Sequence, residues 1–283
     1  MRRLDDFPRD HPAWDLLLGA TPFQVSSAEP RLSWTTYVPP SYRDRTGPLG
    51  LLVAVHGTGR RVEATRDRFA ALADELGVVV LAPLFPAGLD GPDDVHAYKE
   101  LLAAGIRFDE ALLAMVEQAA GRWEIDTTRF VLTGFSGGGQ FAHRFAYLHP
   151  HRLRAVSVGA PGRVTLPDDA PWPLGLGGVA DLFGTAPSVA ALRQVPYQVV
   201  VGSEDLAGAL LAAVAADPRE ARAGATRVDR ARRLAHELTE RGVPVETAVV
   251  PGAGHDAGAV APAVVDFVRR ALAQGPPGRA SHH

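Results

Sequence analysis

A serine set between glycines is the feature of this 283-residue chain with the clearest chemical meaning. The pentapeptide Gly134-Phe135-Ser136-Gly137-Gly138 directly follows a strand-like run, residues 130–133, and precedes a helical pattern over residues 141–148. In that context the glycines allow a sharp, strained turn that exposes the serine hydroxyl. The free N–H groups and the positive end of the helix dipole can stabilise a negatively charged oxygen. We therefore expect Ser136 to be a nucleophile; the alternative is a glycine-rich β–α turn without chemistry.

A serine hydroxyl becomes a good nucleophile only when a neighbouring base takes its proton. Of the ten histidines, His255 is the one that lies on a loop directly after a late strand, residues 245–250. A carboxylate is needed to fix the tautomer of that histidine. The segment Gly202-Ser203-Glu204-Asp205 follows the preceding strand, and we expect Asp205 to supply the carboxylate. Glu204 is the alternative, because the choice depends on a register of one residue.

The second glycine motif, His56-Gly57-Thr58-Gly59, follows the apolar run of residues 49–55. A loop at this position can donate a backbone N–H to an oxygen that becomes negative during acyl transfer. We expect this oxyanion hole to consist of the N–H of Gly137 and that of Thr58 or Gly59. The His56 side chain is expected to order the loop by hydrogen bonding rather than to act as the base. The alternative for this motif is an ordinary glycine turn.

Strand-like and helix-like segments alternate along the chain, which predicts an α/β fold with a mostly parallel sheet and helices on both faces. One run alternates apolar and polar residues and reads as an edge strand, whereas the later runs are mostly apolar, as in strands buried on both faces. The expected strands are residues 32–38, 49–55, 78–81, 130–133, 155–158, 197–201 and 245–250. Apolar stripes at helical spacing predict helices over residues 69–76, 108–123, 234–238 and 260–268.

Two stretches, residues 83–105 and 161–194, do not follow this alternation. Long irregular segments in a compact α/β domain are usually loops over a site, although a surface excursion without a role is possible. The second stretch is expected to be a small flap whose apolar side chains form a substrate wall above Ser136, with core packing as the open alternative. These side chains are Trp172, Leu174, Leu176, Leu182 and Phe183.

Near the first irregular stretch, Tyr98, Lys99 and Arg107 could contact an acidic group of the substrate. A solvated helix end is the plainer interpretation of the same residues. Tyr98 is kept as a candidate substrate contact.

Composition limits the class of protein. The chain lacks cysteine, which excludes disulfides, cysteine nucleophiles and thiolate metal sites. Its net charge of −3 argues against a strongly basic nucleic-acid-binding protein, and it has no apolar run long enough to span a membrane. Its start does not read as a secretory signal, so a cytoplasmic location is expected. We expect one domain over residues 1–275 and a disordered tail over residues 276–283.

In combination and order, the motifs HGTG, GFSGG, GSED and GAGH resemble the α/β-hydrolase superfamily. The resemblance covers residues from about Ser33 to about Ala273. Within the superfamily, the chain is similar to the polyhydroxybutyrate-depolymerase-like and feruloyl-esterase-like group. Secreted members of that group usually carry signal peptides and disulfides, and the absence of both features here favours an intracellular enzyme.

The resemblance implies a serine hydrolase that cleaves a small or medium carboxylic ester through an acyl-enzyme. Ser136, Asp205 and His255 would form the triad, and no metal or organic cofactor is required. A thioesterase, lactonase, amidase or acyltransferase would use the same triad. A ligand-binding protein that has lost catalysis remains a further alternative.

Overall fold

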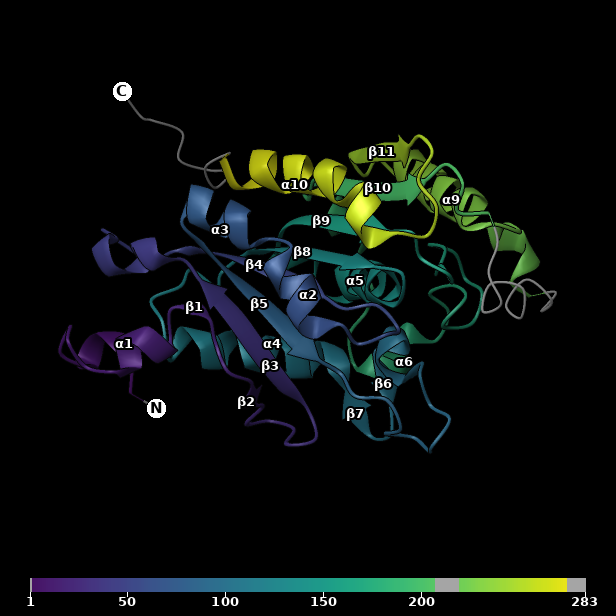
Figure 1. Ribbon diagram of the computed structural model, residues 1–283. Helices are drawn as coiled ribbons and strands as arrows, with labels where there is room; N and C mark the ends of the chain where they lie inside the picture. Colours follow the sequence, from purple (N-terminus) through teal and green to yellow (C-terminus); the bar gives the residue numbers. More distant parts are fainter. Residues whose placement is uncertain (1, 207–218, 274–283) are drawn as a thin grey trace, which may run out of the picture.

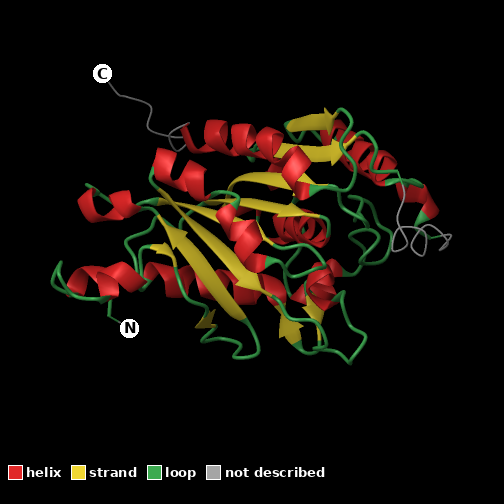
Figure 2. Ribbon diagram, viewed as in Figure 1, coloured by secondary structure: helices red, strands yellow, loops and turns green. Residues whose placement is uncertain are grey.

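The computed structural model describes residues 2–206 and 219–273, and a nine-stranded sheet organises this part of the chain (Figures 1 and 2). The strand order is β1-β3-β5-β4-β8-β9-β10-β11, and β2 pairs with β3. The pairs from β5 to β11 are parallel, whereas β1, β2 and β3 join the sheet in antiparallel pairs. The strands are β1 (Gly19–Ala20), β2 (Gln24–Val25), β3 (Ser33–Val38), β4 (Gly50–Val55), β5 (Val78–Leu84), β8 (Phe130–Phe135), β9 (Leu153–Gly159), β10 (Tyr197–Gly202) and β11 (Val245–Val250).

The central strands are buried on both faces, as their continuous apolar sequences predict. In β4, Leu51, Val53 and Val55 belong to the core on one face of the sheet, and Leu52 and Ala54 to the core on the other. This alternation follows from the two-residue period of a strand. The positions of the predicted strands are confirmed, while β1 and β2 were not predicted because two residues carry no periodic signal. The predicted edge strand is wrong, because β3 pairs with β1 and β2 as well as with β5. The strand at the other end of the order, β11, is partly exposed and not buried on both faces, because it has a neighbouring strand only in β10.

Helices cover both faces of the sheet, which confirms the predicted fold class. Side chains of α4, α5 and α9 belong to one core and those of α3 and α10 to the other, while α2 packs against β5 and β3. Figure 1 shows α2, α3 and α10 on the near side of the sheet and α4 and α5 behind it. The α-helices are α1 (Ala13–Leu16), α2 (Val62–Asp67), α3 (Ala70–Leu76), α4 (Phe108–Ala120), α5 (Gly137–Leu148), α6 (Val179–Phe183), α7 (Val189–Leu192), α9 (Arg227–Glu240) and α10 (Ala257–Ala273).

The loops that carry the predicted site residues leave β4, β8, β10 and β11 at the carboxyl edge of the sheet, because these strands are parallel. The irregular stretch of residues 83–105 holds a short 3₁₀ helix, η3 (Ala97–Glu100), and the strand β6 (Leu102–Ala103), which pairs with β7 (Ile106–Arg107). The second irregular stretch contains α6 and α7. Further 3₁₀ turns are η1 (Leu4–Asp6), η2 (Pro40–Asp44), η4 (Pro150–Arg152) and η5 (Ala221–Ala223).

Within residues 2–206 and 219–273, no helix is both long and apolar enough to cross a bilayer. The expected disordered tail, residues 276–283, lies outside the described residues.

Candidate active site

The turn between β8 and α5 holds Ser136 in a strained backbone conformation, with φ 57° and ψ −113°. The Ser136 N–H donates to the carbonyl of Gly159, 2.8 Å away, which anchors the turn to β9. The turn also needs glycine at its sides. A Cβ at Gly134 would lie 2.3 Å from the Gly138 carbonyl, and a Cβ at Gly138 would lie 2.2 Å from the Val55 carbonyl oxygen. Strain of this kind persists where the surrounding structure enforces it, as at reactive side chains.

Three predicted residues from three loops form one hydrogen-bonded chain. The Ser136 Oγ lies 3.0 Å from His255 Nε2, and His255 Nδ1 lies 2.6 Å from Asp205 Oδ2. The Asp205 side chain is fully buried, whereas Glu204 is exposed to solvent. The structure thus places Asp205, and not Glu204, against the histidine. This geometry suits proton transfer from the hydroxyl to the imidazole.

Contacts between the loops after β10 and β11 bring the acid and the histidine together. Gly202 lies so close to the second loop that an added Cβ would be 2.2 Å from the Ala253 carbonyl oxygen. The Glu204 N–H donates to the same carbonyl at 2.8 Å. The Phe135 ring lies 4.8 Å from the His255 ring, centroid to centroid, and supports the imidazole from the side of β8.

Arg227, at the start of α9, holds the second oxygen of the buried acid, and the sequence did not reveal this role. Its Nη1 donates to Asp205 Oδ1 at 3.0 Å, and both side chains are buried. A buried carboxylate requires such a partner, because an unpaired buried charge is costly. The two oxygens of Asp205 therefore face two different donors, one on His255 and one on Arg227.

Gly137 and Thr58, two of the residues whose N–H groups the sequence proposes as oxyanion donors, lie next to each other. A Cβ placed on Gly137 would be 3.1 Å from the Thr58 nitrogen, so the backbones of the two motifs are in contact. The same Cβ would be 2.3 Å from the Tyr98 hydroxyl and 2.9 Å from Lys99 Cε. Gly59, in contrast, is exposed, and a Cβ added to it would have no neighbouring atom within 4 Å.

The Tyr98 side chain contacts the loop that follows β4 and does not line the cavity beside Ser136. It is fully buried, and its hydroxyl donates to the His56 carbonyl at 3.0 Å, so the expected substrate contact is wrong. Lys99 is also buried, with its Nζ 2.9 Å from His96 Nδ1. Arg107 is bonded to Asp109, at 2.9 and 2.6 Å.

His56 orders the loop, as the sequence predicts. Its Nε2 accepts from the Phe85 N–H at 3.0 Å, so the proton is on Nδ1, which donates to the Gly57 carbonyl at 2.8 Å. Burial lowers the pKa of this imidazole to about 4. The ring is therefore neutral at pH 7 and has both nitrogens engaged within the protein.

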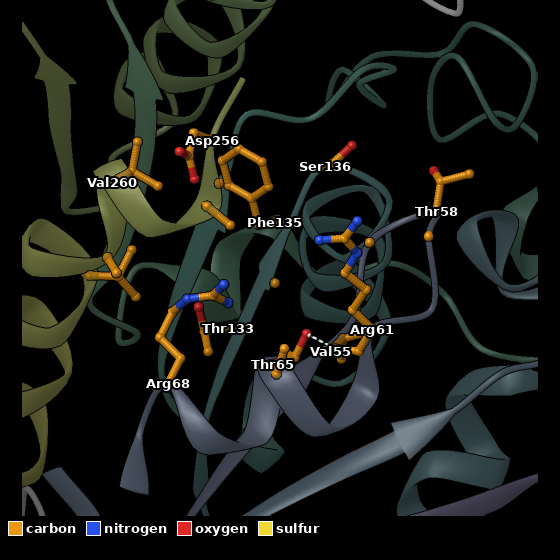
Figure 3. A pocket seen from close by; sticks show the side chains of 18 of the residues that line it. Val55, Thr58, Arg61, Thr65, Arg68, Thr133, Phe135, Ser136, Asp256 and Val260 are labelled. Atoms are coloured by element: carbon orange, nitrogen blue, oxygen red, sulfur yellow. Dashed lines mark hydrogen bonds between the residues drawn. The ribbon is translucent and has the colours of Figure 1, made fainter. Parts of the chain in front are cut away.

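A cavity of about 490 Å³ opens beside Ser136 and His255 (Figure 3). This volume is within the range of small-molecule sites. Its walls come from α2 and α10, two helices on the near face of the sheet, together with the loops after β4 and β8. No sequence motif predicts that α2 or α10 lines the site.

The expected apolar wall from residues 161–194 lies elsewhere. Trp172 and Leu174 line a second hollow of about 460 Å³, which does not include Ser136. Phe183 is buried and meets Trp172 edge to face, with ring centroids 5.1 Å apart. None of these three side chains lines the cavity beside Ser136, so the expected substrate wall is wrong.

Among the described residues, Asp109, Glu110 and His149 form the cluster with side chains of metal-ligand type. The Asp109 carboxylate already accepts bonds from Arg107 and, at 2.8 Å, from His149 Nε2. The neighbouring guanidinium supplies the positive charge that a metal ion would bring, so we assign no metal to this cluster.

Comparison with known proteins gives one match by sequence and many by structure. No protein-family model matches the chain. The chain is 27% identical over 132 residues to an acetylxylan esterase from Coprinopsis cinerea; the match covers 46% of the chain and about a third, 34%, of the fungal protein.

Similarity to solved structures extends over most of the chain. A poly(aspartic acid) hydrolase from Sphingomonas sp. KT-1 has a TM-score of 0.73 at 20% identity, over 89% of this chain and 99% of the other. A poly(3-hydroxybutyrate) depolymerase from Bordetella parapertussis has a TM-score of 0.70 at 26% identity, over 88% of both chains. Ferulic acid esterases also match.

The relatives named as esterases belong to the class of enzyme that the sequence motifs predict for this chain. Together with the sheet topology, the structural likenesses show that the chain has an α/β-hydrolase fold, similar to that of a poly(3-hydroxybutyrate) depolymerase and of ferulic acid esterases, while part of its sequence is similar to an acetylxylan esterase.

Proposed function

We propose that this chain is a serine hydrolase that cleaves a carboxylic ester through an acyl-enzyme on Ser136. The observation that carries the proposal is the continuous hydrogen-bonded chain from the Ser136 Oγ through His255 to the buried Asp205, at 3.0 and 2.6 Å. Each group in that chain has the chemistry required of nucleophile, base and orienting acid.

In the first half-reaction, the Ser136 Oγ attacks the ester carbonyl carbon while His255 Nε2 takes the hydroxyl proton. The carbonyl oxygen becomes negative and accepts hydrogen bonds from the N–H groups of Gly137 and Thr58. We prefer Thr58 to Gly59 because its nitrogen is the one adjacent to Gly137. The tetrahedral intermediate then collapses, His255 returns the proton to the leaving oxygen, and the alcohol departs.

In the second half-reaction, a water molecule attacks the acyl carbon while His255 accepts one of its protons. Collapse of the second intermediate returns that proton to the Ser136 Oγ and releases the carboxylic acid. Asp205 holds His255 through Nδ1 and stabilises the imidazolium that forms twice in the cycle. These steps require no metal or organic cofactor.

Thioesters, lactones and amides present the same carbonyl to the same groups, and an alcohol acceptor would replace water in acyl transfer. The ester is our first choice because the chain matches an acetylxylan esterase in sequence and a polyester depolymerase in structure. A panel of acyl substrates of equal chain length, with ester, thioester and amide leaving groups, separates these activities.

The direct test is labelling with a fluorophosphonate probe combined with turnover of 4-nitrophenyl butyrate. The wild-type chain should become labelled at Ser136 and should release 4-nitrophenol. Ser136→Ala, which removes only a hydroxyl, should fold normally, resist labelling and lose at least about 10³-fold in kcat. A wild-type protein that is folded, unlabelled and inactive would favour the ligand-binding alternative.

A further inference from the structure

The helix α2 presents one face to the cavity beside Ser136. The cavity-lining residues here are Ala64 and Thr65 within α2 and Arg61 and Arg68, the N-cap and C-cap residues at its two ends. Their spacing of i, i+3, i+4 and i+7 places them along one side of the segment. Figure 3 shows the Arg61 and Arg68 side chains extending from this segment into the hollow below Ser136. Two of the four side chains on this wall are therefore cationic.

Within the described part of the chain, no hydrogen bond and no ion pair within 4.0 Å involves the guanidinium of Arg61 or Arg68. The other two cavity-lining arginines differ. Arg60 donates to the carbonyls of Thr58, Phe85 and Val95, at 2.6, 3.2 and 3.2 Å, and Arg227 pairs with Asp205. The guanidinium groups of Arg60 and Arg227 are therefore engaged within the protein, whereas those of Arg61 and Arg68 have N–H donors available to a ligand.

One acid faces the same cavity. The Asp256 carboxylate accepts the Gly258 N–H at 2.7 Å, at the start of α10, and its charge acts on Arg68 without a direct contact. Arg68 is half-buried, and a half-buried cation gains more from an anionic partner than an exposed one does. Two available cations face one carboxylate, so the space is net positive.

A second wall of the cavity is apolar. It is formed by the face of α10 that carries Ala257, Val260, Ala261 and Val264, again at i, i+3, i+4 and i+7. A ligand that fits both walls has a carbon skeleton on one side and an anionic group on the other.

We infer that the substrate is an ester whose acyl or alcohol part is an apolar chain bearing a carboxylate, held by Arg61 and Arg68. This inference rests on the proposed function, since it places the ester carbonyl at Ser136. Guanidinium groups suit a carboxylate because their planar N–H donors match its two oxygens.

The test compares esters that differ by one carboxylate. For the acyl side, the pair is mono(4-nitrophenyl) adipate and 4-nitrophenyl hexanoate, in which a methyl replaces the carboxylate. For the alcohol side, the pair is 4-carboxybenzyl butyrate and 4-methylbenzyl butyrate. In at least one pair, the wild-type kcat/KM for the anionic ester should exceed that for the neutral one by about tenfold or more, the size of a charge-assisted contact. The ratio should fall as salt is raised, because salt screens the attraction.

Variants then assign the preference to the two arginines. Arg61→Gln and Arg68→Gln should each lower the anionic-to-neutral ratio, and the double variant should bring it to about one. Arg61→Glu should lower the anionic-to-neutral ratio further than Arg61→Gln does, because a negative charge then faces the anionic ester. Arg61 is exposed, so the protein should fold with this change. The matched control is Arg232→Gln on the exposed side of α9, away from the cavity, which should leave the ratio unchanged.

A wild-type ratio of about one in both pairs would overturn the inference. So would a high ratio that survives in the Arg61→Gln/Arg68→Gln double variant. Either result leaves the proposed function intact, provided that the neutral esters are turned over in a Ser136-dependent way. Failure of the proposed function has a different signature, namely no turnover of any ester and no fluorophosphonate labelling.

Discussion

Replacing the buried acid by its amide, Asp205→Asn, tests the hydrogen-bonded chain most sharply, because the structure constrains both ends of the new side chain. The Asp205 oxygens accept from His255 Nδ1 and from Arg227 Nη1. Arginine can only donate, so the asparagine must turn its carbonyl oxygen toward Arg227. Its NH₂ group then points at His255 Nδ1.

An NH₂ donor at Nδ1 forces that nitrogen to be the acceptor and moves the imidazole proton to Nε2. His255 Nε2 faces the Ser136 Oγ at 3.0 Å, so a proton there removes the general base. We expect kcat to fall by about 10⁴, or roughly 5 kcal/mol of barrier, the loss expected when the imidazole is held in the wrong tautomer.

The assay is steady-state release of 4-nitrophenol from 4-nitrophenyl butyrate, with circular dichroism to confirm folding. The matched control is Glu204→Gln, an identical chemical change at the exposed neighbour, which should retain kcat within about twofold because surface substitutions perturb little. Reversed effects of the two substitutions would refute the assignment of the acid.

A second variant tests the reason for the loss. In Asp205→Asn/Arg227→Met, the donor that fixes the amide orientation is gone, so the asparagine can turn its oxygen to His255 Nδ1–H. This double variant should be at least about tenfold faster than Asp205→Asn, an interaction between neighbouring sites that additive effects do not predict. If the double variant melts as a folded domain but turns over the ester no faster than Asp205→Asn does, Arg227 does not set the orientation of the amide.

Three further predictions concern the oxyanion donors, the irregular stretch and pH. Gly137→Ala adds a methyl carbon that would lie 2.3 Å from the buried tyrosine hydroxyl beneath it, so the donor N–H must shift and kcat should fall by about 10² to 10³ in the same assay. Phe183→Ala should lower stability by about 3–5 kcal/mol in urea denaturation. Neither it nor Trp172→Ala should alter the chain-length ranking of 4-nitrophenyl esters; a changed ranking would restore the substrate-wall interpretation. Burial lowers the pKa of His56 to about 4 and that of His143 to about 3, so protons bind the unfolded chain first as pH falls. The free energy of unfolding should therefore decrease from about pH 6.5 toward about pH 4, with a slope of up to roughly 2.7 kcal/mol per pH unit. A melting temperature that does not change between these pH values would contradict the neutral, buried state of both rings.

The sequence by itself determined the parts of this protein whose signals are local. A continuous apolar run marks a strand buried on both faces, and the strand–glycine–serine–glycine order marks the turn at Ser136. Chain order and the carboxyl edge of a parallel sheet were enough to select His255, and a one-residue choice after β10 selected Asp205. These features follow from backbone geometry over a few residues, so no tertiary contact is needed to read them.

The tertiary structure alone decided which side chains surround those groups. Arg61 and Arg68 read in sequence as the polar side of a short helix, and they become a cavity wall only because α2 packs across the sheet beside Ser136. Arg227 is 22 residues from Asp205 in the chain, and their contact depends on where α9 meets β10. Tyr98 looked like a surface group, yet its burial under Gly137 depends on packing that no local pattern encodes. The pairing of distant segments is fixed by burial of the whole core, which is why the sequence indicated the chemistry of the site but not the shape or charge of the space around it.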